Sequence, residues 1–232
     1  MDYWELKIVK MYQIVFFLLS SLIFLSCAEK ETETKEQTKT SVISLPYYNE
    51  PTFTPIFVDD NNDVQKKITH TISDFSFLNQ DSLLINQHIF DNKIHIANFI
   101  FTSCGSICPT MTKNMKLVND SLKDNKDLTF LSYSVTPWID KPHILKKYSQ
   151  DNAIKNTNWH FLTGTKGDIY KLARQSYFAE EDIGFSKDST DFLHTEHFIL
   201  VDKTKRIRGI YNGTLVVDMH QLIADIKTIE KE

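Results

Sequence analysis

The chain has 232 residues, of which 41% are apolar and 24% are charged, and its formal net charge is -4. Lysine and arginine are scattered along the chain and form no basic stripe, so the composition does not favour a nucleic-acid-binding protein. Once a leader and a linker are set aside, the remaining length suits a single globular domain with one hydrophobic core.

Residues 1–27 have the pattern of a targeting signal. Two lysines precede residues 14–25, which are apolar apart from two serines, and the segment ends at Cys27. This run is short for a spanning helix, which needs about 20 residues. A small residue before the cysteine resembles a bacterial lipobox, although Phe24 stands where leucine is usual. We expect a lipoprotein acylated at Cys27 and anchored to a membrane outside the cytoplasm; the alternative is an uncleaved anchor helix, which gives the same location.

Residues 28–63 are predicted to connect this anchor to the domain. Glu, Lys and Thr dominate residues 28–40, which lack large apolar side chains and therefore cannot form a core. Residues 41–63 contain three prolines with aromatic residues between them, a pattern typical of an extended segment on a domain surface. The globular domain is accordingly predicted at residues 64–232.

The domain is predicted to be of the α/β class, with a hairpin at residues 72–84 in front of alternating strands and helices. The expected elements are a buried strand at 94–101, a helix that begins at Pro109, a strand at 128–135, a helix from Pro142, a strand at 159–162, a helical segment around 169–173, a hairpin of strands 197–202 and 206–211, and a helix at 216–229. This order is that of a thioredoxin-like fold, in which helices flank a central mixed sheet. Periodicity alone also fits a flavodoxin-like sheet, so the choice between the two folds depends on the cysteines.

Cys104 and Cys108 are the two thiols that remain if Cys27 carries lipid. They lie between a buried strand and the first turn of a helix, where unpaired amide hydrogens and the helix dipole favour a thiolate. Residues four apart can meet on one side of a helical turn, so this redox-active pair can chelate a soft metal ion or close a disulfide. A purely structural disulfide is less favoured, because it would close a very short loop.

Two thiolates leave a copper(I) ion short of its usual third ligand, so a histidine is expected nearby. His194 precedes the predicted strand at 197–202, in a loop that packs against the cysteine turn in a thioredoxin fold. His197 is the alternative, but it lies within the strand pattern. We predict His194 as the third metal ligand. The other histidines are expected to be structural or exposed: His70, His88, His95, His143, His160 and His220.

The residues from about 71 to the end of the chain resemble the Sco family. Residues 101–109 look like its Phe-Thr-x-Cys-x-x-x-Cys-Pro signature, and residues 194–202 like its His-Ser/Thr ahead of a Leu-Ile/Val-Asp strand. Residues 134–142, 159–164 and 206–213 are similar to its Ser-Val-Asp-Pro-x-x-Asp-Thr-Pro, Trp-x-x-Leu-Thr-Gly and Arg-x-x-Gly-x-Tyr-x-Gly segments.

Two positions depart from the family pattern. Gly105 replaces the common proline after the first cysteine, and Thr136 replaces an acidic residue near the site. A carboxylate at position 136 therefore cannot tune the metal, and Asp140 is the acidic residue that remains.

The resemblance implies an extracytoplasmic metallochaperone that binds copper(I) or copper(II) through Cys104, Cys108 and His194. Its implied partner is subunit II of cytochrome c oxidase, whose dinuclear copper centre it would help to assemble, or another copper-accepting protein. The resemblance favours a chaperone over an enzyme. The alternative is a dedicated thiol-disulfide reductase that acts on the cysteines of a copper-accepting or cytochrome partner.

Three other classes fit the sequence less well. A general thiol-disulfide oxidoreductase would use Cys-x-x-Cys and a later cis-proline, but no proline follows Pro142. A peroxiredoxin-like peroxidase would need an arginine near Cys104, and none is near in the sequence. A structural zinc site would need four ligands, and only two thiols are available.

Overall fold

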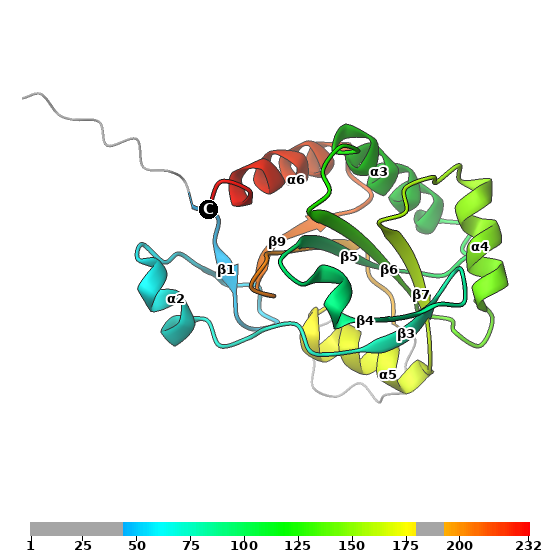
Figure 1. Ribbon diagram of the computed structural model, residues 1–232, viewed down its shortest axis with the longest axis horizontal. Helices are drawn as coiled ribbons and strands as arrows, with labels where there is room; N and C mark the ends of the chain where they lie inside the picture. The colour runs from blue at the N-terminus through cyan, green and yellow to red at the C-terminus, as the bar shows by residue number, and fades with distance from the viewer. Residues whose placement is uncertain (1–43, 180–192) are drawn as a thin grey trace, which may run out of the picture. The chain divides into compact units, whose positions relative to one another are not determined.

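The computed structural model describes residues 44–179 and 193–232, whose strands form one mixed sheet of nine strands in the order β2-β1-β9-β8-β5-β6-β7-β3-β4 (Figure 1). The strands are β1 (Tyr47–Tyr48), β2 (Pro55–Ile56), β3 (Ser76–Asn79), β4 (Leu84–Asn86), β5 (Ile94–Ile100), β6 (Leu128–Ser134), β7 (Trp159–Thr163), β8 (His197–Val201) and β9 (Ile207–Asn212). All seven residues of β5 and of β6 are buried, as the apolar runs in the sequence predict for central strands.

Helices cover both faces of the sheet. The α-helices of the described residues are α2 (Asn61–Lys67), α3 (Ile107–Ser121), α4 (Pro142–Asp151), α5 (Lys166–Lys171) and α6 (Val216–Ile229). Apolar side chains of α3, α4 and α6 pack together in one core cluster, and those of α5 belong to another. Figure 1 shows α6, α3 and α4 following one another along one side of the sheet, with α5 on the other. This is the predicted α/β, thioredoxin-like arrangement, and the extra hairpin is present as β3 and β4.

The turns that form the candidate site lie at one edge of the sheet. β5 pairs parallel with β6, which pairs parallel with β7, while β8 is antiparallel to both β5 and β9. The strands β5, β6, β7 and β9 therefore run in the same direction and end at one edge, where β8 begins. We call this the carboxyl edge. The helices α3, α4, α5 and α6 all start there, because each follows one of these strands.

The segment before the core domain joins the sheet. Residues 44–63, for which the sequence indicates an extended surface segment, contain β1 and β2, and Tyr48 of β1 pairs with Ile207 of β9. Two-residue strands carry no periodic signal, so only their partner in the fold defines them. The part of the predicted connection that the structure describes is thus hydrogen-bonded to the domain.

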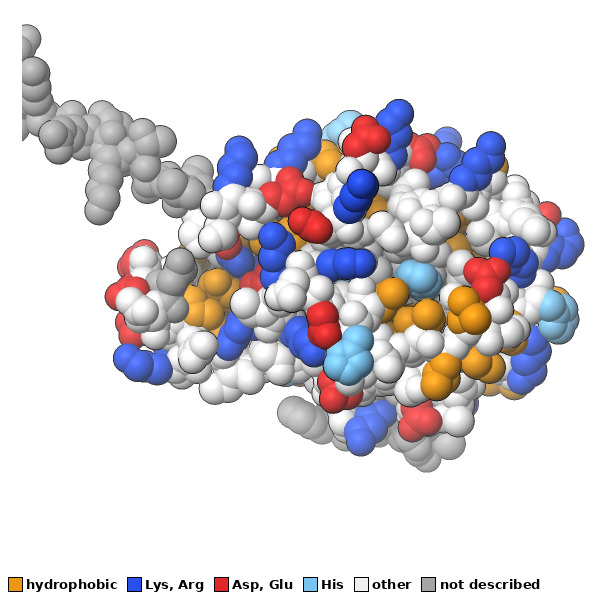
Figure 2. All heavy atoms as spheres, viewed as in Figure 1, with side chains coloured by type: hydrophobic (Ala, Val, Ile, Leu, Met, Phe, Trp, Pro, Cys, Tyr) orange, Lys and Arg blue, Asp and Glu red, His pale blue; other side chains and the backbone are white. Residues whose placement is uncertain are grey.

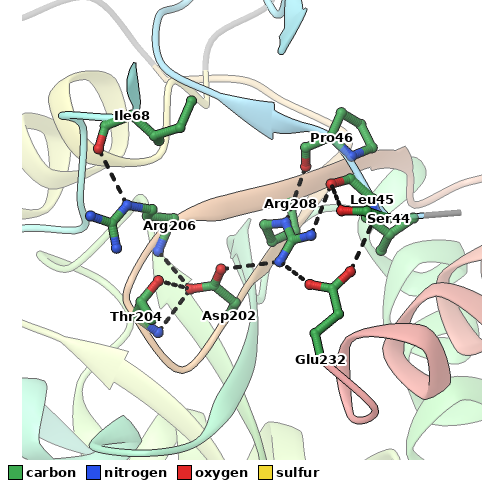
Figure 3. A network of polar contacts seen from close by, with 9 residues as sticks. All are labelled: Ser44, Leu45, Pro46, Ile68, Asp202, Thr204, Arg206, Arg208 and Glu232. Atoms are coloured by element: carbon green, nitrogen blue, oxygen red, sulfur yellow. Dashed lines mark hydrogen bonds and ion pairs between the residues drawn. The ribbon is translucent and has the colours of Figure 1, made fainter. Parts of the chain in front are cut away.

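A buried arginine holds this segment in place (Figure 3). The guanidinium of Arg208 donates hydrogen bonds to the carbonyl oxygens of Leu45 (2.8 Å) and Pro46 (3.2 Å). It also pairs with the carboxylates of Asp202 at 3.3 Å and Glu232 at 2.6 Å. Its side chain is 2% exposed, so these partners replace the water that the charge loses on folding. We call Arg208 and these four residues the Arg208 network.

The predicted signal, tether and acylated Cys27 lie outside the described residues. Within residues 44–179 and 193–232, no helix is both long enough and apolar enough to cross a membrane.

His95 is a histidine held neutral inside the core. Its side chain is fully buried, its ring stacks on Phe90 at 4.2 Å between centroids, and its Nε2 lies 3.1 Å from the hydroxyl of Tyr177. Burial, assisted by the charge of Lys205, lowers the pKa of His95 to about 3. The folded protein therefore excludes a proton that the unfolded chain binds below its pKa of about 6.5.

Replacing His95 with phenylalanine is expected to make the free energy of unfolding fall less steeply as the pH is lowered. A lowered folded pKa means that the full stability is present above about pH 6.5 and is lost as the pH falls toward 3, by about 1.4 kcal/mol per pH unit. Between about pH 6.5 and pH 4.5 the parent should thus lose about 2.3 kcal/mol more than the variant, measured by urea unfolding. The control is the same change at the exposed His143, which should keep the parent's slope; equal slopes for parent and His95→Phe would contradict the assignment.

Candidate functional site

The two predicted thiols lie together at the carboxyl edge. β5 ends at Ile100, and α3 begins at Ile107, so Cys108 is in the first turn of the helix and Cys104 is in the turn before it. Both cysteines are free thiols, with Cys108 buried at 4% exposure and Cys104 partly exposed. The two sulfur atoms are close enough for the thiol of one to hydrogen-bond to the other. The prediction from the spacing, that residues four apart meet, agrees with this arrangement.

The two thiols have opposite shifts in pKa. Burial alone would raise the pKa of Cys104, but hydrogen bonds from the backbone N–H groups of Cys108, Ser106 and Ile107 and from the Cys108 thiol lower it below its ordinary value. Burial raises the pKa of Cys108 to about 12, and its contact with Cys104 and the negative charge of Asp140 act in the same direction. Cys104 is therefore the thiol of the pair that ionises more readily, and the buried Cys108 thiol donates a hydrogen bond to its sulfur.

Asp140 lies in the turn after β6 and accepts hydrogen bonds from the turn that carries the thiols. Its carboxylate is fully buried and accepts hydrogen bonds from Thr102 Oγ1 (2.5 Å) and the Thr102 backbone N–H (3.2 Å). Ser134 Oγ at 2.6 Å and Thr136 Oγ1 at 2.9 Å are further donors. Thr136, which departs from the family pattern, is thus a hydrogen-bond donor to this carboxylate. Asp140 fastens the turn after β6 to the residue two positions before Cys104.

Asn114 connects helix α3 to the turn between β9 and α6. It lies on the buried face of α3, and its Nδ2 donates to the carbonyl oxygen of Gly213, 2.8 Å away in the turn between β9 and α6. The Gly213 N–H in turn donates to the carbonyl oxygen of Glu196 at 2.7 Å, just before β8. A side chain on Gly213 would collide with Phe198 and with this carbonyl, so only glycine permits the close approach. The sequence analysis did not identify Asn114, although a polar residue on an apolar helix face is a usable signal.

Gly105 leaves the mouth of the site open. A Cβ atom built at this position would meet no other atom within 4 Å, and Gly105 and its neighbours Ser103 and Ser106 are exposed. The partly exposed sulfur of Cys104 therefore lies beside open solvent, where a metal ion or a second thiol can approach it.

His194 is placed at the same edge of the sheet but outside any metal-binding cluster. In the antiparallel pairing of β5 and β8, Ala97 lies opposite Ile199, and a continuation of this register brings His194 level with Thr102. The side chain of His194 is exposed. Among the described residues, no three His, Cys, Asp or Glu side chains are grouped closely enough to hold a metal ion. The topology thus brings His194 to the edge that carries the thiols, and its role as a ligand stays a prediction.

His197 also lies at the carboxyl edge, but its ring packs against an aromatic neighbour, and the other histidines lie elsewhere. His197 is partly buried as the first residue of β8, opposite Asn212, and its ring packs edge-on against Phe53 at 5.8 Å between centroids. His95 and His160 are buried on the sheet, and His88 pairs with Asp91 on the surface.

The chain has a thioredoxin-like sheet, and its Cys-x-x-x-Cys pair lies at the start of the helix that follows a central strand. These two features define a thioredoxin-like protein with a paired-cysteine site. Residues 63–231 match the family described as SCO1/SenC. The chain is also 31% identical over 167 residues to the SCO1 protein homolog of Bacillus subtilis, an alignment that covers 71% of this chain and 86% of the relative. The chain therefore belongs to the SCO1/SenC family.

Solved structures agree with this assignment. A SCO1/SenC family lipoprotein from Bacillus anthracis is 30% identical, with a TM-score of 0.61 and coverage of 69% of this chain and 95% of that one. BsSco, described as a member of the Sco family of cytochrome c oxidase assembly proteins with a disulfide switch, is 31% identical, with a TM-score of 0.59 and coverage of 70% and 94%. The copper-bound ScoI of Bradyrhizobium japonicum is 23% identical, with a TM-score of 0.55 and coverage of 68% and 99%, and shares the fold.

Proposed function

We propose that this protein is an extracytoplasmic copper-binding metallochaperone that assists the assembly of the dinuclear copper centre of cytochrome c oxidase. The observation that carries the proposal is the pair of adjacent sulfur atoms at a helix start, one partly exposed with a lowered pKa and the other buried with a raised pKa. Thiolates select soft ions such as copper(I). The copper-bound ScoI and the role named for BsSco support the same reading.

In this proposal Cys104 and Cys108 hold the copper, and His194 supplies a nitrogen ligand. Loss of the Cys108 proton accompanies metal binding, because the metal replaces it between the two sulfurs. His194 reaches the sulfurs when its exposed side chain moves toward Cys104, since the described residues contain no ready three-ligand cluster. Acylation of Cys27 would keep the domain at a membrane surface, and the relative from Bacillus anthracis, described as a lipoprotein, supports this anchoring.

Replacing either Cys104 or Cys108 with serine is expected to weaken copper(I) binding by more than about 100-fold, because the loss of a ligand exceeds the 10-fold to 100-fold effect of its outer-shell partners. Metal analysis and a competition titration on the reduced protein measure this. The parent should hold one copper per chain, and oxidation that joins the two sulfurs should abolish uptake. Cys27→Ser is the matched control and should leave the stoichiometry unchanged. If a variant with both cysteines replaced by serine held copper as tightly as the parent, the proposed site would be refuted.

Replacing His194 with alanine is expected to weaken copper(II) more than copper(I) and to change the thiolate-to-copper charge-transfer band, because copper(I) tolerates the two remaining sulfur ligands. His197→Ala is the control. It should leave the spectrum nearly unchanged, because His197 lies in β8 against Phe53. One absorption spectrum and one titration for each variant suffice, and the reverse pattern would assign the nitrogen ligand to His197.

A further inference from the structure

We propose that Asn114 is a positioning residue, which holds residues 194–196 beside the thiols and so allows the site to bind copper(II). We call residues 194–196 the His194 segment. The inference rests on the proposed function, in which His194 supplies the nitrogen ligand. It adds a residue that acts on this ligand through hydrogen bonds rather than by contact with the metal.

Asn114 is a polar side chain on the buried face of a helix. It is 3% exposed, and it shares this face of α3 with the buried Met111, Met115 and Val118. Charged side chains instead cover the outer sides of α3 and α6, as the top of Figure 2 shows. A buried amide without a hydrogen bond is costly, so this side chain needs a specific partner.

The partner lies in the turn between β9 and α6. Asn114 Nδ2 donates to the carbonyl oxygen of Gly213 at 2.8 Å, and the Gly213 N–H donates to the carbonyl oxygen of Glu196 at 2.7 Å. Asn212 adds a second link, because its Nδ2 donates to the carboxylate of Glu196. The peptide groups of this turn therefore stand between α3 and the third residue of the His194 segment.

The turn between β9 and α6 is itself closely held. Asn212 Oδ1 accepts hydrogen bonds from the backbone N–H of Thr214 at 2.8 Å and from Thr214 Oγ1 at 2.6 Å. The N–H of Asn212 donates to the carboxylate of Asp218, in the first turn of α6, at 2.8 Å. A turn with these internal bonds passes the position of α3 on to the His194 segment, because it has little freedom to absorb a displacement.

The His194 segment lies beyond the part of β8 that is paired with the central sheet. The pairing of β8 with β5, the strand that leads to Cys104, ends at Ile199. His194 lies five residues before this point, about 16 Å along an extended chain. The pairing with β9 continues for two more residues, to His197. Toward the thiols, β8 is thus supported by β9 and by the turn after it, which Asn114 joins to α3.

A second support holds the segment from the opposite face of the sheet. Leu193 is 1% exposed and belongs to the core cluster that includes the side chains of α5. This contact fixes the segment to the face away from α3. Among the described residues, the hydrogen bonds that join the segment to the helix of the thiols run through Gly213 to Asn114. Loss of the Asn114 amide should therefore change where His194 lies relative to the thiols and leave the segment attached.

The expected effect falls on copper(II). Partners that orient a metal ligand from outside the coordination shell change metal affinity by about 10-fold to 100-fold when they are removed. Two thiolates suit the soft copper(I) ion, whereas copper(II) gains from an imidazole nitrogen. A displaced His194 should therefore resemble a missing one.

The experiment titrates the full chain, purified in detergent and reduced, with copper(I) and copper(II) against competing chelators. The variants Asn114→Leu and Asn114→Ala both lack the donor but differ in volume, so an effect that they share follows from the donor. We expect both to weaken copper(II) by about tenfold or more and to change the charge-transfer band as His194→Ala does. Copper(I) affinity should be nearly unchanged. In the His194→Ala background, Asn114→Leu should add no further loss, because the ligand that it positions is gone.

Asn119→Leu is the matched control. Asn119 is 6% exposed in the last turn of α3, at the end of the helix away from Cys108, and it bonds to Asn156 before β7. The change removes a buried amide and its hydrogen bonds from the same helix without touching the turn between β9 and α6. Its copper(II) affinity and spectrum should match those of the parent.

The other outcomes overturn the inference. Parent-like copper(II) affinity in both Asn114 variants, together with weakened binding in His194→Ala, would refute it and leave the proposed function intact. Equal losses for copper(I) and copper(II), or a further loss in the His194→Ala background, would show that Asn114 supports the thiol helix instead. An equal loss in Asn119→Leu would reduce the effect to a general weakening of α3. If His194→Ala itself left copper(II) unchanged, the nitrogen ligand of the proposed function would be wrong, and this inference with it.

Discussion

Arg208→Met is expected to lower the free energy of unfolding by about 3 to 5 kcal/mol, the usual effect of breaking a buried ion pair from one side. The substitution keeps most of the side-chain volume but leaves the carboxylate of Asp202, whose side chain is 7% exposed, without its cation. It also removes the donors to Leu45 and Pro46 and the guanidinium that lies 4.0 Å from the centre of the Tyr47 ring. Chemical denaturation at neutral pH measures the change.

Arg206→Met is the matched control, because it removes the same charge from a neighbouring position. The bond from Arg206 Nε to the carbonyl oxygen of Ile68, at 3.3 Å, is a single one, so the expected loss is about 1 kcal/mol. If the two variants lost equal stability, the Arg208 network would contribute nothing beyond an ordinary hydrogen bond.

Asp140→Ala is expected to lower the free energy of unfolding by about 3 kcal/mol or more, because it leaves four donors without an acceptor. Each buried, unpaired donor costs about 1 to 3 kcal/mol. The donors are the hydroxyl groups of Thr102, Ser134 and Thr136 and the backbone N–H of Thr102. The same change removes a negative charge that raises the pKa of Cys108, so that pKa should fall. Denaturation gives the first effect, and the pH dependence of thiol alkylation gives the second.

Asp120→Ala is the control for the lost charge. Asp120 is an exposed residue of α3 that pairs with Lys116 at 2.5 Å, and such surface pairs contribute about 1 kcal/mol or less. It should change neither the stability by more than that nor the alkylation of Cys108. An unchanged alkylation profile for Asp140→Ala would show that the carboxylate supports the turn but does not influence the thiols.

The central part of the fold follows from sequence periodicity. The buried runs that became β5 and β6 and the helical spacing of α3 and α6 were predicted within a residue or two, because burial on a strand or helix face leaves a local pattern. The strands β1 and β2 and the helix α2 were not predicted as elements. The strands are only two residues long, and β1 depends on β9 and Arg208, more than 150 residues away in the sequence.

The site was predictable to the extent that it is local. The adjacency of Cys104 and Cys108 follows from their spacing at a helix start. Their unequal pKa values do not, because these depend on burial and on Asp140, which comes near through the pairing of β5 with β6. The topology also brings the segment of His194 to the same edge, but coordination depends on side-chain geometry in the bound form, so that ligand stays a prediction.

The Arg208 network has a mechanical consequence. A pull on the chain before Ser44 would reach the domain first at the carbonyl groups of Leu45 and Pro46, and then pass through Arg208 to β9 and the C-terminal residue. Because β9 runs from this anchor toward the carboxyl edge, the strain would be borne at the end of the sheet that lacks the cysteines. The geometry of the two sulfur atoms would in this way be isolated from a load applied to the chain before Ser44.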